Sequence, residues 1–205
     1  MIHTVGDSHS MFGWKDVDQS LVKINHIGPK LMYTFSRDRE KVVTRSVYSS
    51  IRAGDFLIYC FGEIDCRCHV AKHVSSDIDH IKIINQLSSD YTDAVQYMSS
   101  KYMQQGAKPA VYSIVPPIRK LEGVSNSEFP FLGSDHERLQ YHRYMNERLR
   151  SLCSERDIMF FDVTRKYEDS DGYLIPEKSD RKCHISDPQG IIETLQEMGL
   201  VSPGI

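Results

Sequence analysis

The residues best suited to chemistry lie near the two ends of the sequence. Gly6-Asp7-Ser8 follows the short apolar run 2–5, and His184 comes four residues after Asp180. A serine hydroxyl is a weak nucleophile at neutral pH, so it needs a base within hydrogen-bonding distance and a third group that orients the base. Ser8 as nucleophile, His184 as base and Asp180 as orienting acid would fill these roles.

Each of these residues also has an ordinary structural explanation. Gly-Asp-Ser is a common turn tripeptide. His184 could be a half-exposed loop histidine, and Asp180 could be a turn residue after Ser179. The catalytic interpretation therefore depends on a fold that brings both ends of the chain together.

An acyl-transfer site also needs hydrogen-bond donors for the negatively charged oxygen of the reaction intermediate. The backbone N–H groups of Ser8 and Gly28 are candidates, and the turn from Gly62 to Arg67 offers a third. Gly28 lies in His26-Ile27-Gly28-Pro29, whose glycine and proline indicate a turn.

Apolar runs and helical stripes alternate along the chain. We expect strands at 2–5, 56–61, 110–115 and 158–163, and helices at 40–52, 76–105, 135–156 and from Asp187-Pro188 to 199. Residues 11–35 give no clear pattern. Strands that alternate with helices indicate an α/β fold, here one three-layer α/β/α domain over residues 1–205 with a four- or five-stranded parallel sheet. The polar turns after the strands would meet at one edge of that sheet.

Composition excludes several other classes of protein. The chain has 205 residues, of which 40% are hydrophobic and 26% charged, and a net charge of −3, so nothing favours a nucleic-acid partner. It contains no apolar run long enough to span a membrane and no secretory signal. Five cysteines, an odd number, favour free thiols in a reducing compartment, which predicts a cytoplasmic protein.

A metal or thiol protein is the weakest alternative. Cys66, Cys68, His69 and His73 form a cluster in the sequence, but their spacing is not that of the usual zinc pairs. We therefore expect neither a metal site nor a cofactor.

Four short blocks, in order along the chain, resemble the SGNH/GDSL hydrolase superfamily. Gly6-Asp7-Ser8-His9 resembles the block with the nucleophile, and Gly28 resembles the isolated glycine of the second block. Gly62-Glu63-Ile64-Asp65 resembles the third block, Gly-x-Asn-Asp, and the segment 180–184 resembles the block that supplies acid and base. The resemblance implies a flavodoxin-like fold and a Ser8–His184–Asp180 esterase or acyltransferase site.

The sequence departs from this pattern in two places. Ile64 stands where the family has an asparagine that donates to the oxyanion, and Asp180 and His184 are separated by three residues instead of two. Arg67 is our candidate for the missing donor, with its direction fixed by Glu63 or Asp65. Asp65 is also expected to shape its turn, and Glu63 could repel an oxyanion unless it is protonated or paired.

The resemblance implies a small ester substrate, with an O-acetylated carbohydrate as the first choice. The loop 118–133 and the segment 165–180 would shape the pocket. Phe129, Phe131 and Tyr173 in these segments could stack on a sugar or pack the loops down. The alternative function is a binding protein of the same fold with little or no catalysis, which the loss of the asparagine at Ile64 favours.

Overall fold

A five-stranded parallel sheet forms the middle layer of the molecule. The computed structural model describes residues 1–120 and 128–202. The strands are β1 (Ile2–Gly6), β2 (Val22–His26), β3 (Phe56–Cys60), β4 (Lys108–Tyr112) and β5 (Met159–Phe161). Their order across the sheet is β2-β1-β3-β4-β5, and every pairing is parallel. The predicted α/β class and the flavodoxin-like strand order are thus confirmed.

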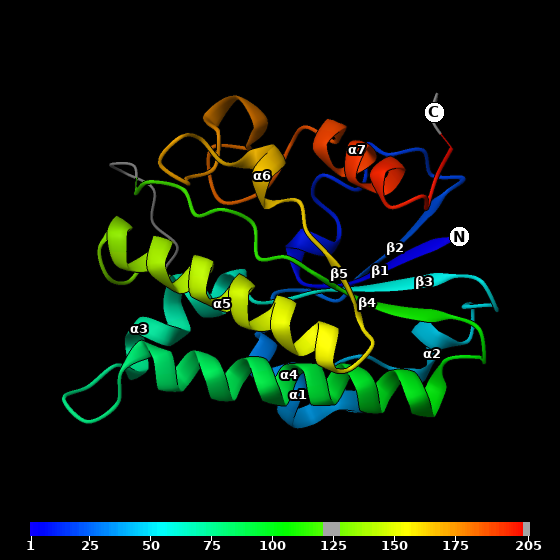
Figure 1. The fold of residues 1–205 in the computed structure, drawn as a ribbon, viewed down its shortest axis with the longest axis horizontal. Helices are drawn as coiled ribbons and strands as arrows, with labels where there is room; N and C mark the ends of the chain where they lie inside the picture. The colour runs from blue at the N-terminus through cyan, green and yellow to red at the C-terminus, as the bar shows by residue number, and fades with distance from the viewer. Residues whose placement is uncertain (121–127, 203–205) are drawn as a thin grey trace.

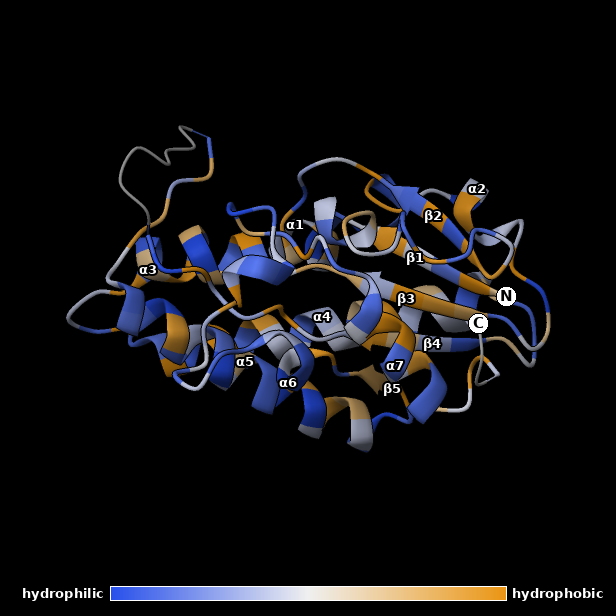
Figure 2. Ribbon diagram, turned by 90° about the horizontal axis from the view of Figure 1, so that it is seen from above, coloured by the Kyte–Doolittle hydropathy of each residue, from blue (hydrophilic) through white to orange (hydrophobic). Residues whose placement is uncertain are grey.

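The strands differ in how clearly the sequence predicts them. β3, with the sequence Phe-Leu-Ile-Tyr-Cys, is central and buried on both faces, and it carries the hydrophobic colour in Figure 2. β2, which the sequence did not predict, has the sequence Val-Lys-Ile-Asn-His and lies at the sheet edge, with only Val22 buried. An edge strand with polar side chains carries no continuous apolar run, which explains the omission.

Seven α-helices cover the sheet in the described part of the chain. They are α1 (Met32–Asp38), α2 (Arg45–Tyr48), α3 (Val70–His73), α4 (His80–Tyr102), α5 (Asp135–Glu155), α6 (Thr164–Tyr167) and α7 (Gln189–Glu197). Figure 1 shows α1, α4 and α5 on one side of the sheet and α6 and α7 on the other.

Two hydrophobic clusters follow from this layering. Alternate residues of β3 enter different clusters: Leu57 and Tyr59 pack with α1, α4 and α5, whereas Ile58 and Cys60 pack with residues of α7 and with Trp14. Because successive strand side chains point to opposite faces, a five-residue apolar strand supplies both cores. The sheet is thereby held rigidly between two layers.

Several predicted helix ends are corrected by the structure. α4 begins at His80, where the Asp79 carboxylate accepts from Lys82 N at 2.8 Å, and not at the predicted residue 76. It ends at Tyr102, before the predicted residue 105. The predicted helix 40–52 is instead a 3₁₀ turn followed by the short α2. α5 has the predicted start: Ser134 and Glu137 form a reciprocal capping box.

The carboxyl edge of the sheet carries the polar turns. β1 lies between β2 and β3, so the chain order reverses at this point, and ligands bind at such a point in open α/β sheets. Part of the predicted loop 118–133, residues 121–127, lies outside the described residues. No described helix combines the length and the apolar character needed to cross a bilayer.

Candidate active site

The turn after β1 fixes the position of Ser8. Gly6 has φ +156°, and a Cβ at this position would lie 1.9 Å from the carbonyl oxygen of Cys60 in β3, so only glycine fits. The carboxylate of Asp7 then accepts from His9 N at 2.8 Å and caps the short 3₁₀ turn Ser8–Ser10. Ser8 is therefore the first residue of a tightly held turn at the carboxyl edge of the sheet.

His184 is held by a loop that wraps around Asp180. Asp180 Oδ1 accepts hydrogen bonds from the backbone N–H groups of Lys182, Cys183 and His184, at 2.8 to 3.1 Å. Arg181 adopts φ +59°, a left-handed conformation. This conformation accommodates the extra residue between Asp180 and His184, so the unusual spacing still brings the two side chains together.

Ser8, His184 and Asp180 form one chain of hydrogen bonds. Ser8 Oγ lies 2.9 Å from His184 Nε2, and His184 Nδ1 lies 2.6 Å from Asp180 Oδ2. The side chains of His184 and Asp180 are 15% and 22% exposed, so the pair is shielded but reachable. Phe12 stacks on the His184 ring at 4.2 Å between centroids, which further restricts the ring.

The surroundings favour the neutral imidazole and the ionised carboxylate. Burial, and then the charge of His9, lower the pKa of His184 by more than Asp180 raises it. Burial raises the pKa of Asp180, but the hydrogen bonds from His184 outweigh this, so that pKa lies below its ordinary value. With Asp180 accepting at Nδ1, the proton of neutral His184 lies on Nδ1 and the lone pair of Nε2 points at Ser8.

The Asp187 side chain lies at the start of α7 and is not bonded to His184 in the structure. Its carboxylate accepts from Gln189 N at 3.0 Å at the start of α7, one residue beyond the predicted start at Pro188. The hydroxyl of Tyr167 donates to the carbonyl of Asp187 at 2.7 Å and accepts from Ile191 N at 3.0 Å. These bonds fix α7 to the segment that follows β5, and with it the loop that carries His184.

The predicted backbone donors lie in the turns after β1 and β2. The N–H groups of Ser8 and Gly28 donate to no other described residue. Nothing lies within 4 Å of the position that a Gly28 Cβ would take, so the surface there is open. Ile64 is 3% exposed and, with its aliphatic side chain, offers no donor.

Arg67 lies on a π-helical segment, Asp65–His69, and is buried and firmly paired. Its Nε and Nη2 donate to the two carboxylate oxygens of Glu63 at 2.7 and 3.0 Å, and its Nη1 donates to the carbonyl of Phe129. The Arg67 and His9 charges outweigh burial and hold the pKa of Glu63 well below its usual range. Glu63 is thus a paired carboxylate, which removes the expected repulsion of an oxyanion.

His9 is the residue of this site that sequence analysis missed. Its Nε2 lies 3.7 Å from Glu63 Oε2, and its ring centroid lies 5.0 Å from that of His184. Burial lowers the pKa of His9, but Glu63 and Asp7 raise it by more. Burial also raises the pKa of Asp7 to about 6. Two features of the sequence could have indicated His9: its position beside Ser8, and the i, i+4 pair of Glu63 and Arg67.

Asp65 does not contact the Ser8–His184–Asp180 chain in the structure and instead caps a helix. Its two carboxylate oxygens accept from Met32 N and Tyr33 N, at 2.7 and 3.2 Å, at the start of α1. Burial raises its pKa to about 7, against the effect of these hydrogen bonds. Asp65 therefore joins the third block to α1.

Phe131 and Tyr173, two of the aromatic residues in the predicted pocket loops, pack against arginines. The Phe131 ring lies 5.0 Å from the Arg67 guanidinium and 5.5 Å from that of Arg138. The Tyr173 ring lies 4.1 Å from the guanidinium of Arg119, and only 8% of Tyr173 is exposed. Packing of the loops, one of the two predicted roles, is the role that these contacts support.

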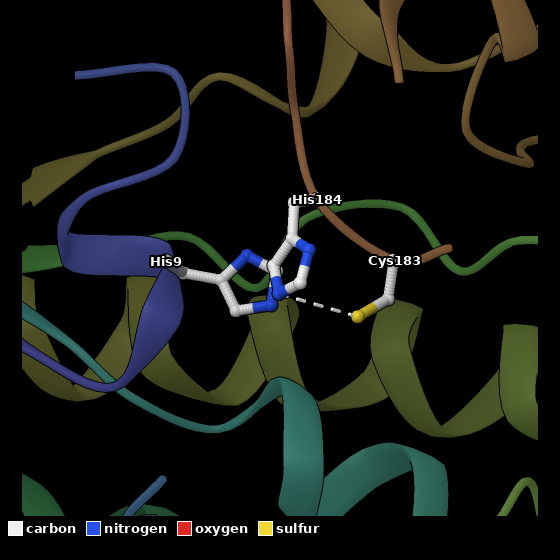
Figure 3. A group of neighbouring side chains, drawn as sticks. All are labelled: His9, Cys183 and His184. Atoms are coloured by element: carbon white, nitrogen blue, oxygen red, sulfur yellow. Dashed lines mark hydrogen bonds between the residues drawn. The ribbon is translucent and has the colours of Figure 1, made fainter. Parts of the chain in front are cut away.

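The cysteine-histidine cluster of the sequence is not gathered in space. Cys66 is fully buried in the core, and His69 pairs with His73 at 4.4 Å between ring centroids. Within the described residues, a different set could hold a metal ion: His9, Cys183 and His184. Figure 3 shows these three side chains converging.

Solved structures with a similar arrangement support this interpretation of the fold. No family model matches the sequence, and no curated protein matches it. A GDSL-like lipase from Bacteroides thetaiotaomicron is 11% identical, with 100% of this chain and 88% of that chain covered and a TM-score of 0.64. An aryl esterase from M. smegmatis is 15% identical, with 98% and 99% covered and a TM-score of 0.61. An acetyl xylan esterase is 13% identical, with 98% and 100% covered and a TM-score of 0.58. The four sequence blocks of this chain lie at the edge formed by the carboxyl ends of the strands. The chain thus has the fold of the SGNH/GDSL hydrolases.

Proposed function

We propose that the protein is a serine esterase or acyltransferase in which Ser8 is the nucleophile, His184 the base and Asp180 the orienting acid. The observation that carries this proposal is the unbroken chain of hydrogen bonds from Ser8 Oγ through His184 to Asp180 Oδ2. It lies at the sheet edge where the strand order reverses, the usual place for ligands in this architecture.

The proposed reaction has two stages. His184 Nε2 takes the proton of Ser8 Oγ as this oxygen attacks the ester carbonyl, and then gives the proton to the leaving alcohol. An acyl-Ser8 ester remains. Water, or an acceptor alcohol in a transferase, attacks this ester with His184 again as base, and Ser8 is released. Asp180 keeps the proton on Nδ1 and stabilises the imidazolium that forms.

The oxyanion would be bound by the backbone N–H groups of Ser8 and Gly28, with Arg67 as the third contributor. The Arg67 guanidinium has five N–H groups, and those beyond the ones bound to Glu63 and Phe129 would donate to the oxyanion. Glu63 fixes the direction of the guanidinium.

For the substrate we propose a small ester, with an O-acetylated carbohydrate as the first class to test. The sequence blocks and the likeness to an acetyl xylan esterase support this choice. We place the protein in the cytoplasm in this proposal because its five cysteines all carry free thiols.

Labelling with a fluorophosphonate tests the proposal directly, because only an activated serine reacts. We expect wild-type protein to be labelled at Ser8, and Ser8→Ala to give no labelling and no hydrolysis of acetyl esters. Ser10→Ala is the matched control, because the Ser10 hydroxyl donates to the carbonyl of Asp7 within the same turn. Labelling that persists in Ser8→Ala would show that another serine is activated.

The alternative, a binding protein of this fold, is favoured by one observation: Ile64 supplies no oxyanion donor. Removal of one such donor costs about 10²–10³ in rate. Wild-type protein that binds acetylated sugars but neither reacts with the fluorophosphonate nor releases acetate would establish this alternative.

A further inference from the structure

A cysteine and two histidines converge on the atom that activates the proposed nucleophile. One ring nitrogen each from His9 and His184, together with Cys183 Sγ, lie within 4.8 Å of one another. Figure 3 shows His9 arriving from the turn after β1 and the other two from the segment before α7. His9 Nε2 is a buried nitrogen with no hydrogen-bond partner among the described residues. We propose that His9, Cys183 and His184 form a zinc-binding site that, when occupied, blocks the Ser8–His184 pair.

The separation of the first two ligands fits one tetrahedral ion. Cys183 Sγ lies 3.6 Å from His184 Nε2. Zinc–sulfur and zinc–nitrogen bonds of about 2.3 and 2.0 Å at a tetrahedral angle place the two ligand atoms about 3.6 Å apart. The His9 nitrogen must approach by no more than about 1.5 Å to reach the same ion, within the range of a side-chain adjustment. Ser8 Oγ or water would take the fourth position.

The surroundings of the ligands also suit a metal site. Asp180 accepts from His184 Nδ1 at 2.6 Å, and such a carboxylate behind a histidine orients the ring and strengthens its other nitrogen as a metal ligand. One thiol and two imidazoles favour zinc over magnesium or calcium, which prefer oxygen ligands.

Binding exchanges protons for the metal and leaves every oxidation state unchanged. Zinc binds the thiolate form of cysteine, so Cys183 loses its thiol proton when the ion binds. The zinc ion takes the place of that proton and of any proton on His9 Nε2, and both protons pass to solvent. It also occupies the lone pair of His184 Nε2, which then cannot accept the proton of Ser8.

Metal binding and its effect on the reaction can be tested separately. Only the inhibitory effect rests on the proposed function. In the first experiment, the protein is treated with a chelator and Co²⁺ is then added as a coloured substitute for zinc. Calorimetry then measures the binding of Zn²⁺. We expect one ion per chain, a thiolate-to-cobalt charge-transfer band and displacement of cobalt by zinc.

Variants assign the ligands. Cys183→Ser should lose the charge-transfer band and bind zinc at least about tenfold more weakly, because the thiolate ligand is gone. Cys68→Ser, which changes a partly exposed cysteine outside the proposed site, should bind zinc as wild type does. His73→Ala removes the competing histidine pair with His69 and should also leave binding intact. An unchanged band in Cys183→Ser, or loss of binding in His73→Ala, would overturn the proposal.

Protection of Ser8 from the fluorophosphonate reports the inhibition, with each variant compared with its own zinc-free sample. Zinc should suppress labelling in wild type and in Cys68→Ser but not in Cys183→Ser, and a chelator should restore it. A zinc-bound protein that labels normally would refute the blocking role. If metal-free wild type is not labelled at all, the proposed function fails, whereas the cobalt spectrum still decides whether the metal site exists.

Discussion

At the scale of single residues, the site depends on which partner each carboxylate binds. Asp180 is tied to His184, Glu63 to Arg67 and His9, and Asp65 to the start of α1. Sequence spacing identified Asp180 and Arg67 but not the buried pairing of Glu63 with His9. Such a pairing requires a side chain from the first strand turn to meet one from the third block, and no local pattern encodes that contact.

Replacing Asp180 by asparagine should disable the proposed base. The asparagine oxygen can still accept the backbone N–H groups of the loop, but its NH₂ cannot accept from His184 Nδ1, so the wrong tautomer is favoured. We expect kcat for ester hydrolysis to fall by about 10³–10⁴ with little change in KM. Asp187→Asn is the control and should stay within about twofold of wild type. A smaller effect for Asp180→Asn than for Asp187→Asn would contradict our assignment.

The role of Arg67 needs a double variant. Arg67→Ala alone would leave the Glu63 carboxylate buried and unpaired, which typically costs about 3–5 kcal/mol and confuses activity with folding. In Glu63→Gln/Arg67→Met the buried charge pair is removed as a unit. We expect kcat to fall by about 10²-fold while KM changes little, because the contact forms mainly in the transition state. An unchanged kcat in the double variant would restrict the oxyanion hole to backbone donors.

At the scale of elements, the sequence predicts the buried strands well and the edge of the sheet poorly. β3 shows itself as a continuous apolar run, whereas β2 and α1 lie in the stretch 11–35, where half-buried residues give no clear period. α1 begins with a cap that is distant in sequence: Asp65, from the segment after β3, binds its first N–H groups. A helix whose cap comes from another element lacks the local start signal on which prediction relies.

Asp65 should make stability depend on pH. Its pKa is about 7 in the folded chain and about 3.9 when unfolded, so the folded state holds its proton more tightly. The stabilisation present at low pH is therefore lost as pH rises from about 4 to about 7. Relative to Asp65→Asn, which cannot titrate, wild type should lose free energy of unfolding over this range, by about 4 kcal/mol at most. Chemical denaturation of both proteins at several pH values measures this difference in the free energy of unfolding. The titration of Asp7 occurs in both proteins and therefore cancels in the comparison. A pH-independent difference would contradict the expectation.

At the scale of the whole molecule, the fold class and the meeting of the two chain ends could be predicted from sequence. Strand–helix alternation requires a parallel sheet, and parallel strands place their polar turns at one edge, so Ser8 and the segment 180–184 are directed to the same place. The fine geometry could not be predicted, because Arg181 enters a left-handed conformation only within a loop closed around Asp180. The packing of Phe131 between two arginines likewise depends on tertiary contacts.

Tyr167, at the end of α6, bonds to the start of α7 and so holds the segment that carries His184. Its buried hydroxyl bonds both to the carbonyl of Asp187 and to Ile191 N, so Tyr167→Phe leaves two backbone groups unsatisfied. We expect a loss of about 1–3 kcal/mol in the free energy of unfolding and a several-fold lower kcat, since the loop with His184 is less firmly held. Thermal denaturation and ester hydrolysis measure the two effects. Tyr173→Phe, nearby in the same segment, should change neither, and equal effects in both variants would argue against a specific role for the Tyr167 hydroxyl.

The distance along the chain between Ser8 and His184, 176 positions, has a consequence during synthesis. A nascent chain that ends before Asp180 already contains the proposed nucleophile, the proposed backbone donors and all five strands of the sheet, yet lacks the His184 imidazole that would take the serine proton. If Ser8 is the nucleophile, it would therefore stay unreactive on the ribosome until the segment 180–184 has emerged and folded against the turn after β1. Reactivity at Ser8 would then report that this segment has been made and has reached its place.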